Sequence, residues 1–218
     1  MRSEESMMKQ RIGIMGGTFD PIHLGHLAIA EAAFLEFKLD KVIFIPAKEP
    51  VHKSDLKVSP AKHRYAMTLL ATAANPHFYI SSIELDRSTP SYTSETLKEL
   101  NQRFGGEAEL FFILGADALR DLPTWNDAEE CFDFCQFIGA IRPGLDKKQI
   151  EMTRKYFGKI GYGKIHSLST FELAISATEI RKRVREKQSI RYIVPDEVAV
   201  YIKKEGLYVK DYEPVDTK

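Results

Sequence analysis

Short apolar runs alternate with helical patterns along most of the chain. The apolar runs predict strands over residues 11–15, 41–46, 78–83, 109–114, 137–141 and 164–168. Helical spacing and capping signals predict helices over 24–38, 64–74, 94–104, 127–132, 147–157 and 177–186, and the ordered part ends with 196–204. We therefore expect a polar leader over 1–10, one domain over 11–210 and a tail over 211–218.

The strands are apolar on both faces, which is typical of a parallel sheet covered on both sides. Their alternation with helices predicts an α/β fold, a doubly wound (Rossmann-like) parallel sheet with helices on both faces. Such sheets bind ligands at the carboxyl ends of their strands, where the strand order reverses. The pattern predicts the place of a site and leaves its chemistry open.

Composition narrows the class of protein. The 218 residues are 44% hydrophobic, enough for one sizeable core, and 31 basic residues balance 31 acidic ones. Zero net charge argues against a protein that coats nucleic acid. We find neither a signal peptide nor an apolar run of about 20 residues, so we expect no membrane contact and a cytoplasmic location. Cys131 and Cys135 stand beside phenylalanines, which favours small buried hydrophobes over a metal or redox pair.

Residues 16–26, Gly-Gly-Thr-Phe-Asp-Pro-Ile-His-Leu-Gly-His, lie where the first strand gives way to the first helix. Glycines there let the backbone approach a phosphate, and the amides of the helix start favour an anion. His23 and His26 are three residues apart, so both rings can face the same side, and Gly25 leaves room for a nucleotide. Zinc would need further ligands that are not nearby. A buried structural histidine would explain only one of the two.

A second stretch, Ile175-Ser176-Ala177-Thr178-Glu179-Ile180-Arg181, begins a basic helix. Ser176 or Thr178 can cap that helix, and Arg181 adds a charged fork suited to phosphate oxygens. An ordinary capped basic helix is the alternative, but two phosphate-binding helix starts in one chain fit a polyphosphate ligand.

Both stretches resemble motifs of the nucleotidyltransferase superfamily. The first is similar to G-[GT]-F-D-x-x-H-x-G-H and the second to I-S-[ST]-T-x-I-R, with Ala177 at the variable place. The resemblance implies that His23, His26 and Arg181 are catalytic and contact the triphosphate. The other residues that it assigns to ATP binding are Gly16, Gly17, Thr18, Phe19, Ile175, Ser176 and Thr178.

The middle of the chain resembles nicotinate mononucleotide adenylyltransferases. Residues 46–53 are similar to P-x-x-x-P-P-H-K, with Val51 in place of the second proline, and residues 91–97 to S-Y-T-x-x-T-L. Residues 115–117, 122–125 and 142–144 are similar to G-x-D, L-x-x-W and R-P-G. The resemblance runs from about residue 11 to residue 208.

These segments imply further site residues. His52 would bind the mononucleotide and Lys53 would be catalytic, both through phosphate, although a solvated loop explains them equally well. Gly115, Asp117 and Arg142 are assigned to ATP, with Asp117 on ribose hydroxyls. Tyr92 and Thr93 would present amides to the nicotinate carboxylate. Trp125 would stack on the pyridinium ring; a core position is the alternative, but its polar neighbours argue for a loop.

The implied reaction is adenylyl transfer from ATP to nicotinate mononucleotide, giving nicotinate adenine dinucleotide and pyrophosphate in NAD biosynthesis. Mg²⁺ would arrive with ATP, with no metal site of the protein's own. Two alternatives remain: AMP or CMP transfer to another phosphate acceptor, and a nucleotide-binding regulator without turnover. A class I aminoacyl-tRNA synthetase is disfavoured by chain length. The oligomeric state is open, and a homo-oligomer is compatible with the sequence.

Overall fold

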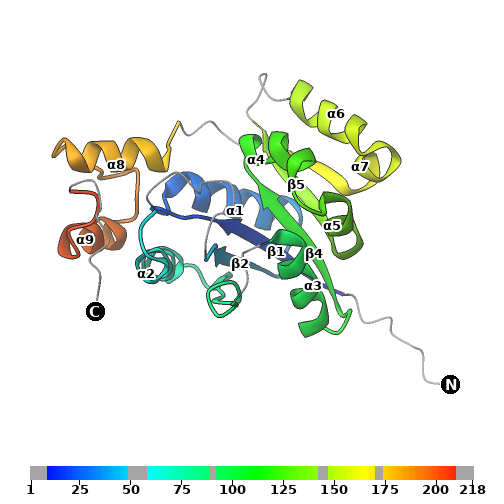
Figure 1. Cartoon of the computed structure of the whole chain (residues 1–218), viewed down its shortest axis with the longest axis horizontal. Helices are drawn as coiled ribbons and strands as arrows, with labels where there is room; N and C mark the ends of the chain where they lie inside the picture. The colour runs from blue at the N-terminus through cyan, green and yellow to red at the C-terminus, as the bar shows by residue number, and fades with distance from the viewer. Residues whose placement is uncertain (1–8, 49–57, 89–91, 142–146, 170–173, 210–218) are drawn as a thin grey trace.

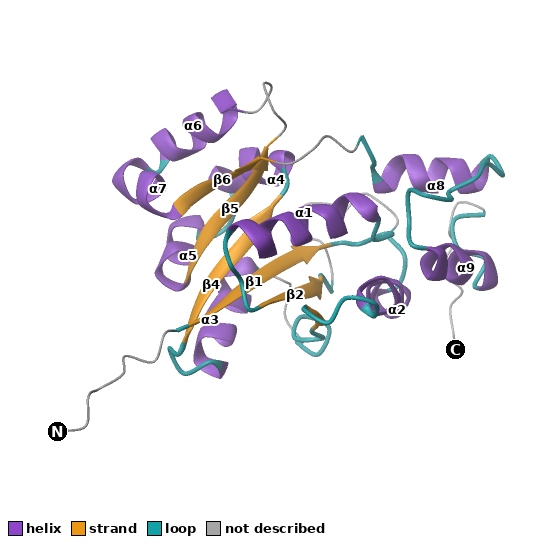
Figure 2. Cartoon of the chain, turned by 180° about the vertical axis from the view of Figure 1, so that it is seen from behind, coloured by secondary structure: helices purple, strands orange, loops and turns teal. Residues whose placement is uncertain are grey.

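The computed structural model describes residues 9–48, 58–88, 92–141, 147–169 and 174–209. Its strands form one parallel sheet in the order β3-β2-β1-β4-β5-β6 (Figure 2). The strands are β1 (Gln10–Gly17), β2 (Lys41–Pro46), β3 (Phe78–Ile80), β4 (Ala108–Leu114), β5 (Cys135–Ile141) and β6 (Ile165–Ser169). The predicted Rossmann-like fold class is confirmed. Gln10, expected to close the leader, is already the first residue of β1.

The strand order reverses between β1 and β4, which are neighbours in the sheet. From β1 the chain proceeds outward through β2 and β3, then returns to β4 and continues outward through β5 and β6. The loops at the carboxyl ends of β1 and β4 therefore start at the place where doubly wound sheets bind ligands.

Helices cover both faces of the sheet. They are α1 (Leu24–Glu36), α2 (Ala61–Thr72), α3 (Thr93–Arg103), α4 (Ala116–Asp121), α5 (Ala128–Phe134), α6 (Lys147–Tyr156), α7 (Gly158–Lys164), α8 (Ala177–Arg185) and α9 (Asp196–Lys204). One core contains buried residues of α3 to α6, and the other contains residues of α1, α2, α8 and α9. In the described residues, no helix is long and apolar enough to cross a membrane.

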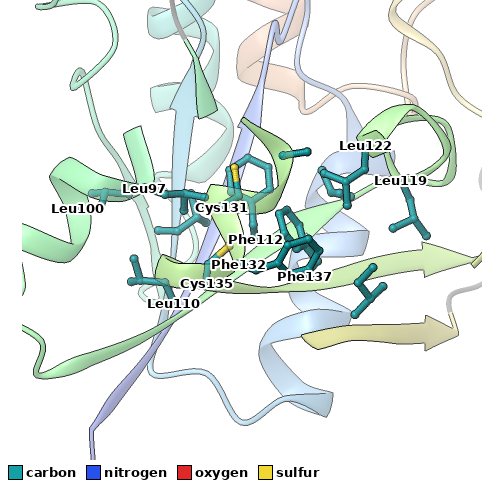
Figure 3. Packing of buried hydrophobic residues seen from close by; sticks show 14 of the residues in the cluster. Leu97, Leu100, Leu110, Phe112, Leu119, Leu122, Cys131, Phe132, Cys135 and Phe137 are labelled. Carbon is teal, nitrogen blue, oxygen red and sulfur yellow. The ribbon is translucent and has the colours of Figure 1, made fainter. Parts of the chain in front are cut away.

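Successive residues of one strand supply the two cores alternately. Phe112 belongs to the core under α3 to α6, whereas its neighbours Phe111 and Ile113 belong to the other core. Cys131 and Cys135 lie in the first of these cores beside Phe132 and Phe137 (Figure 3). Both cysteines are free and buried, as predicted. Burial also raises the pKa of the Cys131 thiol to about 12, so this thiol stays protonated.

In the fold, the structure differs from the sequence-based expectation in its short elements. Helices α4 and α7 were not predicted: α4 has only six residues, and α7 contains three glycines, which lower helix propensity. Lys164, expected to start a strand, instead ends α7, and β3 stops at Ile80 rather than Ile83.

Helices α8 and α9 lie at the end of the molecule opposite the first residues of β1 (Figure 1). They are held there by Ile180, Val198 and Ile202, which are buried in the core that also receives α1 and α2. A hydrogen bond of 2.9 Å between His63 Nδ1 and the Tyr201 hydroxyl joins α2 to α9. The C-terminal helices are thereby placed next to the loop that follows β1.

Candidate nucleotide-binding site

The turn after β1 is tightly packed against aromatic rings. A Cβ on Gly16 would stand 3.0 Å from the ring of Phe112, and one on Gly17 would stand 3.0 Å from the ring of Phe19. Phe19 itself has the left-handed conformation of this turn, with φ of 49°. Its side chain is buried in the core, so Phe19 could contact a ligand only through its backbone. The two glycines therefore serve packing in addition to any approach of phosphate.

His23 and His26 face the same side, as their spacing predicts. Their rings are stacked with centroids 3.7 Å apart, and Phe19 meets the His26 ring edge-on at 5.2 Å. His23 is the N-cap of α1, and its backbone N–H donates to Nδ1 of His26 at 3.2 Å. Because Nδ1 of His26 accepts, the proton of the neutral imidazole is on Nε2.

The backbone amides at the start of α1 correct one expectation. Besides the His23 amide, the Leu24 amide donates to the carbonyl oxygen of Ile193 at 3.1 Å, and the His26 amide donates to that of His23 at 3.0 Å. These three donors are satisfied by the protein, so they do not provide the anion site expected of a helix start. Binding of phosphate here must rest on side chains and on the remaining amides.

His23 is a buried histidine. It is 7% exposed, and no hydrogen-bond partner reaches its Nδ1 within the described part of the chain. Burial lowers the pKa of His23 from its ordinary 6.5 to about 4. His23 is therefore neutral at physiological pH and can act as a hydrogen-bonding group, but not as a cation.

This shift makes the stability of the protein depend on pH. Between pH 6.5 and about 4 the unfolded chain binds a proton at His23 that the folded chain does not, so stability is lost as the pH falls through this range. We expect His23 to account for about 2 kcal/mol of unfolding free energy lost between pH 7 and pH 5. Urea unfolding of the wild type and of His23→Gln at both pH values measures it. Equal losses in the two proteins would contradict the assignment.

Gly25 has a different role from the one expected. A Cβ on this residue would stand 3.0 Å from Nδ1 and 3.1 Å from Cε1 of His23. Glycine therefore leaves room for the imidazole of His23, rather than directly for a nucleotide. The same Cβ would lie 3.9 Å from Cβ of Ile175, which places the second motif against the start of α1.

The second motif meets the first, as the superfamily resemblance implies. Ser176 is the N-cap of α8, and its Oγ accepts from the Glu179 amide at 3.2 Å. Arg181 donates from Nη1 to the carbonyl oxygen of Asp20 at 2.7 Å and from Nη2 to Oγ1 of Thr178 at 3.2 Å. A cation 161 residues distant in sequence is thus fixed on the loop that leads into the two histidines at the start of α1.

Asp20 joins this loop to two further segments, a role beyond the turn that the Asp20-Pro21 pair predicts. The carboxylate is buried; it accepts from the Tyr208 hydroxyl at 2.7 Å and from the Ser59 amide at 3.2 Å. Together with the contact of Arg181 on the Asp20 carbonyl, these bonds hold the loop from three directions. No local signal in the sequence connects Asp20 with Tyr208.

Arg64 was also missed, because it reads as an ordinary basic residue of an amphipathic helix. It is 1% exposed, and its guanidinium donates to three carbonyl oxygens, those of Thr18 at 2.8 Å, Lys48 at 2.9 Å and Ser59 at 2.9 Å. Burial lowers the pKa of Arg64, and the nearby charge of Asp20 opposes that shift. One buried cation therefore joins the loops after β1 and β2 to the start of α2.

The residues expected to bind the pyridine carboxylate lie at the start of α3. Tyr92 is the N-cap of this helix and Thr93 its first residue. Thr96, one turn further, donates from Oγ1 to the buried Glu84 at 2.9 Å. Arg87 anchors the same helix through bonds of 3.2 Å to Thr96 Oγ1 and 2.8 Å to Glu99.

At the end of β4, Gly115 is the N-cap of α4, and Asp117 lies in its first turn. The Asp117 side chain is 86% exposed, and it accepts from Arg120 at 3.1 Å. Because β4 is next to β1, Gly115 and Asp117 follow a strand end adjacent to the histidine loop. Their predicted contacts with ATP stay a prediction.

Trp125 follows a short 3-10 helix, Leu122–Thr124. It has features of both alternatives that the sequence offered, an exposed loop residue and a core residue. It is half-buried and packs edge-on against Phe112 with ring centroids 6.0 Å apart. It also lines a cavity of about 370 Å³ with Pro123, Asp127, Ala128, Glu129, Glu130, Tyr156 and Phe157. Three carboxylates on this cavity disfavour an anionic ligand there. Stacking on pyridine therefore requires another part of the ring.

Three predicted site residues, His52, Lys53 and Arg142, lie outside the described residues. Their roles stay predictions. Within the described residues, no group of three or more His, Cys, Asp or Glu side chains is placed to hold a metal ion.

Comparisons with known proteins agree with this geometry. The model of the Cytidylyltransferase-like family matches residues 14–183. A protein of Thermoanaerobacter sp. (strain X514), named "Probable nicotinate-nucleotide adenylyltransferase", is 48% identical over 203 residues, 93% of this chain and 96% of that protein. A protein of Moorella thermoacetica with the same name is 48% identical over 198 residues, 91% of each.

Among solved structures, the fold is similar to that of Plasmodium falciparum nicotinic acid mononucleotide adenylyltransferase complexed with NaAD. The TM-score is 0.73 at 20% identity, covering 92% of this chain and 98% of that one. At this identity the likeness shows the fold alone.

Proposed function

The chain belongs to the cytidylyltransferase-like family and, within it, to the nicotinate-nucleotide adenylyltransferases, and we infer that it transfers the adenylyl group of ATP to nicotinate mononucleotide. The products are nicotinate adenine dinucleotide and pyrophosphate, a step of NAD biosynthesis. The observation that carries the inference is the meeting of the two motifs. Arg181 contacts the loop that leads into the stacked His23 and His26 at the start of α1, at the reversal of strand order.

In the proposed reaction, the mononucleotide displaces pyrophosphate from ATP directly, without a covalent intermediate on the protein. A phosphate oxygen of the mononucleotide attacks the α-phosphorus of ATP, the bond from that phosphorus to the bridging oxygen breaks, and pyrophosphate leaves. The protein aligns two anions and stabilises the charge that develops. We assign the hydrogen bonds to phosphate to His26 and the neutral His23, and the positive charge to Arg181 and Lys53.

We place Mg²⁺ on the triphosphate, where phosphate oxygens and water supply the ligands that it prefers. The chain's own contribution is then the side chains assigned above, and no step depends on a protein-held metal. We expect a chelator in excess of the metal to abolish activity and added Mg²⁺ to restore it.

The experiment that tests the function is pyrophosphate release from ATP and Mg²⁺. Nicotinate mononucleotide, nicotinamide mononucleotide and phosphopantetheine are compared as acceptors at equal concentration. Rapid release with the first acceptor and much slower release with the others is the expected result. The proposal would be refuted if folded protein that binds ATP released no pyrophosphate with either pyridine nucleotide.

Trp125→Ala should weaken mononucleotide binding and leave ATP binding unchanged. Loss of stacking on a base-like ring costs about 1–3 kcal/mol, so KM for the mononucleotide should rise by roughly 5- to 150-fold. Steady-state kinetics with each substrate varied separately measures both values. Trp125→Phe keeps an aromatic face, also against Phe112, and serves as the control with a smaller effect. Equal losses for both substrates would remove Trp125 from the pyridine site.

We further propose that the protein works in the cytoplasm and binds neither nucleic acid nor membrane. Zero net charge supports the part of this proposal that concerns nucleic acid. A homo-oligomer stays compatible with it, and sedimentation velocity would determine the assembly state.

A further inference from the structure

A continuous series of hydrogen bonds joins the loop after β1 to the first turns of α3. Arg64 donates to the carbonyl oxygens of Thr18 and Lys48. The ammonium group of Lys48 donates to the carbonyl oxygen of Arg87, and the Arg87 guanidinium donates to Oγ1 of Thr96. We call these five residues, Thr18, Arg64, Lys48, Arg87 and Thr96, the polar bridge.

The polar bridge is built to be stiff. Arg64 is 1% exposed, and a buried guanidinium is tolerated only while its donors have acceptors. A shift of the Thr18 or Lys48 carbonyl would leave part of that charge unsatisfied. The Arg87 side chain is 14% exposed and is further held by Glu99 at 2.8 Å. The two ends of the polar bridge therefore keep a fixed separation.

The ends lie at the two substrate positions that the proposed function assigns, on which this inference rests. Thr18 belongs to the ATP motif, and Thr96 lies one turn after Tyr92 and Thr93, which we assign to the mononucleotide. In a direct transfer between two anions, their mutual alignment is the main contribution of the protein. A link between the two positions affects that alignment more than it affects either substrate alone.

We propose that the polar bridge sets the distance between ATP and the mononucleotide, with Arg64, Lys48 and Arg87 as positioning residues that act through the backbone of both binding segments. The dinucleotide product occupies both positions at once, so its affinity depends on their separation, as for two linked binding modules. Each substrate occupies one position, and its affinity does not depend on the separation.

Lys48→Met tests this proposal, because it keeps the aliphatic stem and removes the donor to Arg87. We expect the Kd of α,β-methylene ATP and the Kd of nicotinate mononucleotide to stay within about twofold of wild type. The Kd of nicotinate adenine dinucleotide should rise about tenfold, and kcat should fall about tenfold. Calorimetry measures the three affinities. Lys48→Arg restores a donor and should recover most of the lost kcat.

Lys98→Met is the matched control, since Lys98 lies on α3 with a side chain 57% exposed and outside the polar bridge. In Lys98→Met, the three Kd values and kcat should equal those of the wild type. Wild-type product affinity and kcat in Lys48→Met would overturn the proposal. Equal weakening of all three ligands would also overturn it, because Lys48 would then only support the fold. Failure of the proposed function is distinguished by the wild type, which would then release no pyrophosphate with nicotinate mononucleotide.

Discussion

His26→Ala should keep the fold and lower kcat by roughly 10²- to 10³-fold, the scale for one lost transition-state donor. His26 lies in the first turn of α1, directly after the loop at the reversal of strand order, and its ring is stacked on His23. Its Nδ1 accepts from the His23 amide, so its Nε2 carries a proton. The imidazole can therefore donate to a phosphate oxygen as negative charge develops on it. KM for ATP should change much less than kcat, because the hydrogen bond strengthens in the transition state.

Single-turnover measurement of pyrophosphate release, with both substrates saturating, isolates the chemical step. His77→Ala is the matched control: His77 stacks on Phe34 with ring centroids 4.5 Å apart and lies outside the site, so its loss should leave kcat within about twofold. A rate for His26→Ala close to that of the control would remove His26 from the catalytic machinery.

The fold could be predicted because its signals are local. Strand β4 reads Ala-Glu-Leu-Phe-Phe-Ile-Leu, and both of its faces are covered because Phe111 and Phe112 enter different cores. That pattern predicts a parallel sheet with helices on both sides.

Helix α7 shows where prediction of the fold from sequence fails. Gly161 lowers helix propensity, yet a Cβ there would stand 2.5 Å from the Arg154 carbonyl oxygen. Close packing of α6 on α7 therefore requires the residue that obscures the helix in the sequence.

The site could be predicted only as far as its motifs extend. His23, His26 and Arg181 were recognised from short patterns, and the structure brings their elements together. The helix-start amides of α1 were predicted to be available, but Ile193 supplies an acceptor to one of them from a remote segment. The role of Arg64 was missed for the same reason. Its buried guanidinium is bound by carbonyl oxygens of three separate segments, and no pattern within α2 indicates those contacts. Such tertiary contacts carry no periodicity that a single sequence shows.

Asp20→Ala should have the largest effect on stability, a loss of about 3 kcal/mol in the free energy of unfolding. The substitution leaves the Tyr208 hydroxyl and the Ser59 amide without their acceptor in a buried setting, each at a cost of about 1–3 kcal/mol. It also removes the negative charge that favours the buried Arg64 cation. The contact of Arg181 with residue 20 persists, because it is made to the carbonyl oxygen.

Urea unfolding measures the loss, and Asp40→Ala is the control, since that carboxylate accepts an exposed bond from the Arg11 amide. We expect the control to cost less than about 1 kcal/mol. In the double variant Asp20→Ala/Tyr208→Phe the unsatisfied hydroxyl is gone, so its loss should not exceed that of Asp20→Ala alone. Additive losses would show that the two side chains act independently. The loop of the histidines would then be held chiefly through its backbone, by Arg64 at Thr18 and by Arg181 at Asp20.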